Sequence, residues 1–150
     1  MAEATPPTIL VAEDDHDDAA LLQLAFRRAN IVNPIALVSD GDEAIEYLAG
    51  TGAFRDRRRH PLPIIVLLDI KMPKRGGLEV LAWLRAQPGL GRLPVVVLTS
   101  SRRSADVKRA YDLGANSYLV KPGSPAELIT LGRRLGLYWV VLNQAPEVGP

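Results

Sequence analysis

Short apolar runs alternate with helical patterns along most of the chain. Five runs are rich in β-branched residues and are mostly continuous rather than alternating: 9–12, 35–38, 64–68, 95–98 and 117–120. Continuous apolar runs are typical of strands that are covered on both faces, and such strands occur in parallel sheets packed between helices. The pattern therefore predicts a buried parallel sheet.

The segments between the runs carry apolar residues at helical spacing. They predict helices over roughly 21–29, 42–49, 78–85, 105–113 and 125–142. Tyr111 is expected on the buried face of the fourth helix. Ser124-Pro125 followed by Glu127 predicts the start of the fifth, because Ser caps the first turn, Pro fits its first position and Glu can bond back to the cap.

The alternation of strands and helices predicts the fold class. With right-handed crossovers it gives an α/β fold, a three-layer flavodoxin-like (βα)5 sandwich with parallel sheet order 2-1-3-4-5 and an extended C-terminal helix or tail. We expect a flexible N-terminus over 1–7, one domain over 8–142 and a C-terminal tail over 143–150.

Composition narrows the possible functions. The chain has 150 residues, 47% of them hydrophobic, a net charge of +1 and no cysteine. It can therefore bury a core, but it cannot use disulfides, thiolate metal ligands or thiol catalysis. The balanced charge argues against a nucleic-acid or membrane-surface partner. Because neither a signal peptide nor a membrane span is recognisable, the expected location is the cytoplasm.

Candidate chemistry lies just after the predicted strands. Glu13 and Asp14 follow the first strand and Asp69 follows the third, and these strands are neighbours in the predicted sheet. Thr99 follows the fourth strand and Lys121 the fifth. Ligands of open α/β sheets bind beyond the carboxyl ends of the strands, and clustered carboxylates with hard oxygen ligands suggest Mg²⁺. The sequence thus predicts an acidic magnesium site facing an ammonium and a hydroxyl group.

Each of these residues also has a simpler interpretation. Acidic residues at a strand-to-helix junction often only cap the helix, and we interpret Asp17 and Asp18 mainly as charges at a helix start. A lone Thr is commonly a turn residue, and a lone Lys is commonly solvated. Asp69 is more informative, because a carboxylate that follows five apolar residues of a central strand is costly unless it is paired.

The residues would suit a phosphoryl acceptor. The Asp69 carboxylate could attack phosphorus and form an acyl phosphate, while Mg²⁺, Lys121 and Thr99 offset the added negative charge. No GxxxxGK[ST] phosphate loop is present, so a nucleotide-hydrolysing enzyme is not indicated.

At these positions the chain resembles the receiver domains of two-component response regulators. The matching motifs are ILVAEDD (9–15), LLDIKMP (67–73), VLTSS (97–101) and YLVKP (118–122). The resemblance implies a signalling receiver rather than an enzyme, phosphorylated at Asp69 by the phosphohistidine of a sensor histidine kinase. It implies Mg²⁺ on Glu13, Asp14, Asp69 and the Lys71 backbone carbonyl, a switch pair of Thr99 and Tyr118, and a cis Lys121–Pro122 bond.

A narrower resemblance is to stand-alone regulators that work with phytochrome-type histidine kinases. It rests on the runs DDHDD (14–18), DGDEA (40–44) and YWVV (138–141). It implies a bacteriophytochrome as the kinase partner. Lys71 stands where that group often has an amide, so we expect its charge to change the lifetime of the acyl phosphate; alternatively, the side chain is solvated. Gly76-Gly77 replaces a more usual Asp-Gly.

Two further features concern partners. The basic run 55–60 has no interleaved aromatic residue and is interpreted as a solvated loop or a protein contact. The fifth helix carries more apolar residues than one face requires, which predicts a homodimer through helix 4, strand 5, helix 5 and the C-terminal segment. Alternatively, the tail folds back over its own core.

Two rival functions stay open at this point. One is a degenerate receiver that only docks to partners, against which the complete set of acidic, Thr and Lys residues argues. The other is an FMN-binding protein of the same fold, against which the acids after the first strand argue, because they would repel the FMN phosphate.

Overall fold

The computed structural model describes residues 6–149. Five strands are formed: β1 (Thr8–Ala12), β2 (Ile35–Val38), β3 (Pro63–Leu68), β4 (Val95–Thr99) and β5 (Ser117–Val120). Five α-helices follow them: α1 (His16–Arg28), α2 (Gly41–Ala49), α3 (Gly77–Ala86), α4 (Ser104–Asp112) and α5 (Pro125–Gly136). A short 3₁₀ turn, η1 (Gly52–Phe54), follows α2, and a π-helical segment, η2 (Leu137–Leu142), continues α5. The N-terminal segment that is expected to be flexible is residues 1–7, and residues 1–5 of it lie outside the described residues.

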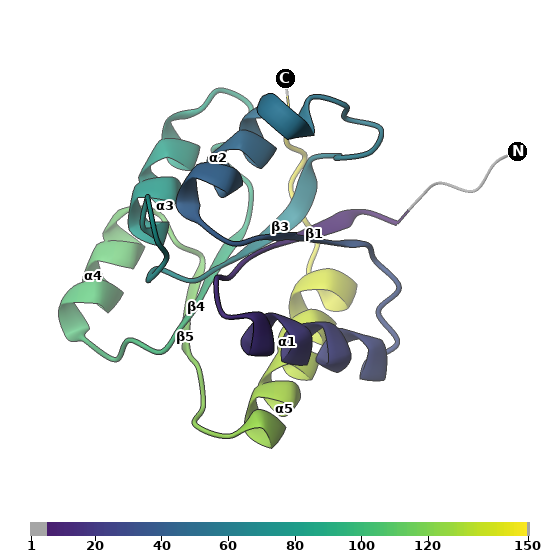
Figure 1. Ribbon diagram of the computed structural model, residues 1–150, viewed down its shortest axis with the longest axis vertical. Coiled ribbons are helices and arrows are strands. Elements are labelled where there is room, and N and C mark those ends of the chain that lie inside the picture. The colour runs from purple at the N-terminus through teal and green to yellow at the C-terminus, as the bar shows by residue number, and fades with distance from the viewer. Residues whose placement is uncertain (1–5, 150) are drawn as a thin grey trace, which may run out of the picture.

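The strands form one parallel sheet in the order β2-β1-β3-β4-β5, as the alternation of elements predicts. Figure 1 shows α1 and α5 on one face of the sheet and α2, α3 and α4 on the other. The flavodoxin-like three-layer sandwich is therefore confirmed. Because all strands run the same way, the loops that follow them meet at a single edge.

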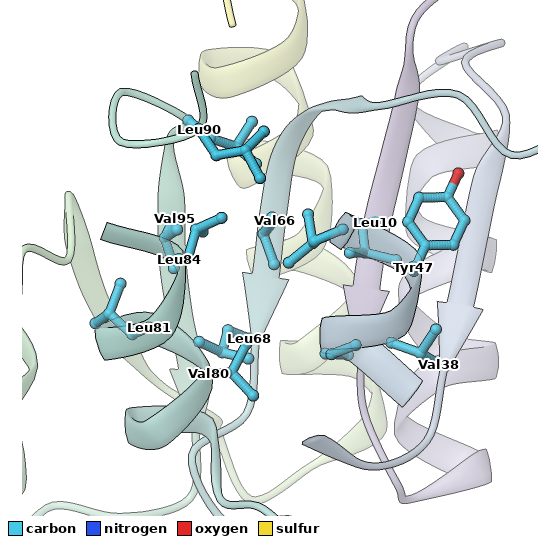
Figure 2. Packing of buried hydrophobic residues seen from close by; sticks show 14 of the residues in the cluster. Leu10, Val38, Tyr47, Val66, Leu68, Val80, Leu81, Leu84, Leu90 and Val95 are labelled. Carbon is cyan, nitrogen blue, oxygen red and sulfur yellow. The ribbon is translucent and has the colours of Figure 1, made fainter. Parts of the chain in front are cut away.

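Each face of the sheet has its own apolar core. Side chains that point toward α2 and α3 form one cluster, seen in Figure 2, which includes Leu10, Val66 and Leu81. Alternate residues of the same strands, such as Ile9 and Leu67, pack on the other face against α1 and α5. Burial on both faces explains why the strand sequences are continuous rather than alternating.

Local signals account for most helix starts. The Asp15 carboxylate accepts hydrogen bonds from the first turn of α1, Asp40 does the same for α2, and Ser124 caps α5 with Pro125 at its first position. The prediction for Tyr111 is wrong, since it is 50% exposed on α4. Only Ala110 of α4 is fully buried, because this helix covers the edge of the sheet next to β5 rather than its centre.

The C-terminal segment turns back toward the loops that precede β3 and β4. The Gly149 N–H donates to the Gly89 carbonyl at 2.6 Å, and Val148 packs against the cluster under α2 and α3. Four apolar side chains of η2 stay at the surface, each about half exposed or more: Leu137, Tyr138, Val141 and Leu142. The other two, Trp139 and Val140, pack against the cluster beneath α1 and α5. In the described residues, no helix is both long enough and apolar enough to cross a membrane.

Candidate functional site

The sheet register sets the candidate residues at one level. Asp69 N–H donates to the carbonyl of Ala12 at 3.0 Å, and Lys121 N–H donates to the carbonyl of Thr99 at 2.8 Å. Glu13 N–H donates in the same way to Val38 at the end of β2. These bonds continue the parallel ladder one step beyond the strands, so the side chains after β1, β3 and β5 emerge at the same edge.

Lys121 is the centre of the polar cluster at this edge. Its Nζ is 3.0 Å from Asp69 Oδ2 and 2.9 Å from Asp18 Oδ2, and it also contacts Glu13 Oε1. The Lys121 side chain is only 9% exposed, and those of Glu13 and Asp69 are 3% and 7% exposed. Burial disfavours the ammonium, but the bonds to Glu13, Asp18 and Asp69 outweigh this and raise the pKa of Lys121.

The acidic residues gather as the sequence predicts. Glu13, Asp14 and Asp69 each place one carboxylate oxygen within 4.8 Å of the others. Burial, together with the negative charge of Asp69, raises the pKa of Glu13 to about 7 against the lowering effect of Lys121. Three carboxylates with a single ammonium leave an excess of negative charge, which a divalent cation would offset. Hard oxygen donors in this number suit Mg²⁺ or Mn²⁺, so the residues fit such an ion.

The second oxygen of Asp69 is also engaged. Asp69 Oδ1 accepts a hydrogen bond from the Lys71 backbone N–H at 2.9 Å, while the Lys71 side chain is exposed. The carboxylate is thereby held between the main chain on one side and Lys121 on the other. The expected cis bond between Lys121 and Pro122 is wrong, because the bond is trans here. An X–Pro bond prefers trans by about 0.5–1 kcal/mol, and the trans form is the one adopted here.

Thr99 is fully buried at the end of β4 and is connected to β5 and α4 through Ser101. The Ser101 N–H points to Thr99 Oγ1 at 3.5 Å, and the Ser101 carbonyl accepts from the Tyr118 hydroxyl at 3.0 Å. The Ser101 hydroxyl donates to Asp106 Oδ2 at 2.5 Å. Thr99 and Tyr118, the expected switch pair, are thus both connected to the same buried serine.

The loop that carries Asp69 is enclosed by close backbone contacts. A Cβ on Gly77 would lie 2.2 Å from the Asp69 carbonyl oxygen, and one on Gly41 would lie 1.9 Å from the Arg75 carbonyl oxygen. Two ion pairs join the same loop to the start of α2, Lys74–Asp40 at 3.5 Å and Arg75–Asp42 at 3.1 Å. Gly77 therefore has a steric role, which the sequence alone leaves unexplained.

Two polar residues at the site were not predicted. Asp18 contacts Lys121 across 103 positions of sequence, although it is interpreted from sequence mainly as a helix-start charge. No local sequence signal could have found this contact, because Glu13 follows β1 whereas Asp18 lies in the first turn of α1. Asp106 lies in the first turn of α4 and bonds to Ser101; no sequence signal distinguishes it from an ordinary helix-start acid.

Comparison with known proteins identifies the family of the chain. Residues 9–132 match the model of the response regulator receiver domain. The chain belongs to this family. Response regulator Rcp1 from Synechocystis sp. is 34% identical over 92% of this chain and 92% of its own length. A probable methanogenesis regulatory protein, FilR2 from Methanothrix harundinacea, is 37% identical over 97% of this chain and 92% of its own length.

Solved receiver domains have the same architecture. The phosphorylated cyanobacterial phytochrome response regulator RcpA superposes with a TM-score of 0.89 at 32% identity, covering 95% of this chain and 99% of its own. The Mn²⁺-bound form of Rcp1 superposes with a TM-score of 0.87 at 33% identity, covering 94% of this chain and 99% of its own. This receiver thus resembles a protein that is named as a phytochrome response regulator. Its acidic cluster has the ligand types that suit a divalent metal.

Proposed function

We propose that this receiver accepts a phosphoryl group on Asp69 and that the phosphorylated protein changes its contacts with other proteins. The observation that carries the proposal is the environment of the Asp69 carboxylate. It is buried, one oxygen accepts from Lys71 N–H, the other accepts from the Lys121 ammonium, and two more carboxylates lie beside it. A carboxylate in this environment is oriented and has an ammonium within reach of an incoming phosphoryl group.

The transfer itself is a single exchange of bonds at phosphorus. A carboxylate oxygen of Asp69 forms a bond to phosphorus as the bond from phosphorus to the donor's imidazole nitrogen breaks, and the electron pair returns to the imidazole. Asp69 thereby becomes an acyl phosphate. Glu13, Asp14, Asp69 and the Lys71 carbonyl would hold Mg²⁺, which when bound offsets the negative charge of the phosphoryl oxygens.

Lys121 and Thr99 would bind the phosphoryl group after transfer. The Lys121 ammonium already lies 3.0 Å from the acceptor carboxylate. Thr99 Oγ1 faces the Ser101 N–H and can accept from it, which leaves the hydroxyl proton free to donate to a phosphoryl oxygen. Because Ser101 also bonds to Tyr118 and Asp106, movement of Thr99 would reach β5 and α4.

We further propose a sensor histidine kinase of the phytochrome type as the donor. The relative RcpA is named for a phytochrome, and it matches this chain over nearly its full length. The methanogenesis regulator FilR2 matches about as well, so transfer should be compared between a phytochrome kinase and a kinase without a phytochrome module. Faster transfer from the phytochrome kinase is the expected result.

The exposed apolar side chains of η2 support a homodimer as the form in which the protein contacts its partners. Tyr138 and Leu142 are 55% and 67% exposed, although Val148 further along folds back on the chain's own core. Light scattering at micromolar concentration, with and without beryllofluoride, measures the mass directly. A monomer under both conditions would contradict the dimer.

The phosphoacceptor is tested with a small donor. Purified protein incubated with Mg²⁺ and acetyl phosphate should gain one phosphoryl group by intact mass, and Asp69→Asn should gain none. Asp42→Asn is the matched control, because Asp42 is a half-buried carboxylate that pairs with Arg75 away from Lys121. Phosphorylation of Asp69→Asn would contradict the assignment of Asp69 as the acceptor. If the wild type gained no phosphoryl group, the proposed function would fail and a receiver that only docks would remain.

A further inference from the structure

Asp18 is the third carboxylate on Lys121, and its position differs from that of the other two. Glu13 and Asp69 follow strands and belong to the acidic cluster that would hold a metal ion. Asp18 lies on the first turn of α1 and outside that cluster, and its Oδ2 is 2.9 Å from Lys121 Nζ. The bond connects α1 with the residue that follows β5.

The ammonium has three protons and three carboxylate partners. Two of those partners would change during the proposed reaction, because Glu13 would bind the metal ion and Asp69 would become the acyl phosphate. Asp18 is the partner that Lys121 can keep throughout. Its side chain is 26% exposed, against 3% for Glu13, so it holds the ammonium from the solvent side of the cluster.

We propose that Asp18 is a positioning residue, which holds the Lys121 ammonium toward the phosphoryl group that enters at Asp69. Without Asp18 the ammonium would be drawn to Glu13, where it competes with a metal ion, and it would spend less time facing the acceptor. This inference rests on the proposed function, because it assigns a role within the same phosphoryl transfer.

Asp17 provides a matched control on the same helical turn. Like Asp18, it is an acid in the first turn of α1, and its backbone N–H donates to the same Asp15 oxygen. The Asp17 side chain is exposed, and within residues 6–149 its carboxylate forms neither an ion pair nor a hydrogen bond. Asp17→Asn therefore removes the same charge from the same helix end and leaves Lys121 with its three partners.

Charge and positioning predict opposite effects of Asp18→Asn. Removing a negative charge near the site should favour approach of an anionic phosphodonor and speed the reaction. Loss of positioning should slow it, by about three- to tenfold if one charge-assisted hydrogen bond is weakened. The sign of the change therefore distinguishes the two effects.

The experiment compares initial rates of phosphorylation by acetyl phosphate and Mg²⁺ in the wild type, Asp18→Asn, Asp18→Glu and Asp17→Asn. We expect slowing only in Asp18→Asn, with the rate largely restored by Asp18→Glu. The Lys121 ammonium resonance in ¹⁵N NMR, assigned with Lys121→Met, should be sharp in the wild type and Asp17→Asn. In Asp18→Asn it should be broadened by faster proton exchange. Asp18→Ala is a second variant, to be used if Asp18→Asn does not fold.

The outcomes separate this inference from the proposed function. If the wild type accepts phosphate but Asp18→Asn reacts as fast or faster, with an unchanged Lys121 resonance, Asp18 has no positioning role and the phosphoacceptor assignment stands. Equal slowing of Asp17→Asn would likewise overturn the inference, because it would show a general charge effect. If the wild type accepts no phosphate, both fail.

Discussion

Replacing Gly77 with alanine tests how tightly the acceptor loop is held. The added Cβ would lie 2.2 Å from the Asp69 carbonyl oxygen and 2.7 Å from Ile70 Cα, where ordinary contact begins at 3.4 Å. Both neighbours are backbone atoms of the acceptor loop, so no side chain can swing away. The loop or α3 must move by about 1 Å. Alanine favours helices over glycine by up to about 1 kcal/mol, but forced overpacking costs about 1–3 kcal/mol, so we expect net destabilisation.

The displacement should affect the reaction more than the stability. Misplacing a reacting group by about 1 Å can lower a rate by about 100-fold, so phosphorylation of Gly77→Ala should slow by at least about tenfold. Urea unfolding followed by circular dichroism measures the stability, and intact mass after incubation with acetyl phosphate measures the rate. Gly123→Ala is the control, because a Cβ there meets nothing within 4 Å. Wild-type stability and rate in Gly77→Ala would refute the steric argument.

Three other outcomes are expected. Lys71→Asn should shorten the lifetime of the acyl phosphate by less than about fivefold, because the charge it removes is exposed and screened; equal decay rates of the two proteins would show that this ammonium does not reach the phosphoryl group. Because the pKa of Glu13 is raised to about 7 from 4.5, the folded protein keeps a proton that the unfolded chain loses. The free energy of unfolding of the wild type in EDTA should therefore fall as the pH rises from about 4.5 through 7. The free energy of unfolding of Glu13→Gln should fall less over the same range. Ser101→Ala should lower the unfolding free energy by about 1–2 kcal/mol, because it removes the bond to Asp106; an unchanged urea midpoint would contradict this.

Much of the fold could be predicted because its signals are local. The continuous β-branched runs identify the strands, and caps such as Ser124 identify helix starts. The exposure of Tyr111 could not be predicted in this way. Helical spacing shows which residues share a face, but it does not show that α4 covers an outer strand and so needs only a narrow buried stripe.

At the candidate site, too, some contacts follow from local sequence and sheet order, and others depend on how the elements pack. The acids after β1 and β3 can be predicted to converge because these two strands are neighbours in the sheet, and Lys121 after β5 can be predicted to emerge at the same edge of the sheet. The contact of Asp18 with Lys121 depends on the angle at which α1 leaves the sheet, which no local pattern specifies. The same is true of Gly77, whose steric role depends on how the acceptor loop passes over α3.

The backbone bonds that set Glu13, Asp69 and Lys121 at one edge of the sheet have a consequence for the newly made protein. Lys121 reaches Asp69 only after β5 has added to β4 as the outermost strand. A nascent chain that has emerged only as far as β4 already contains Glu13, Asp14 and Asp69, but it lacks Lys121. Under the proposed function, the ability to accept a phosphoryl group should therefore arise late in synthesis, once β5 is in place.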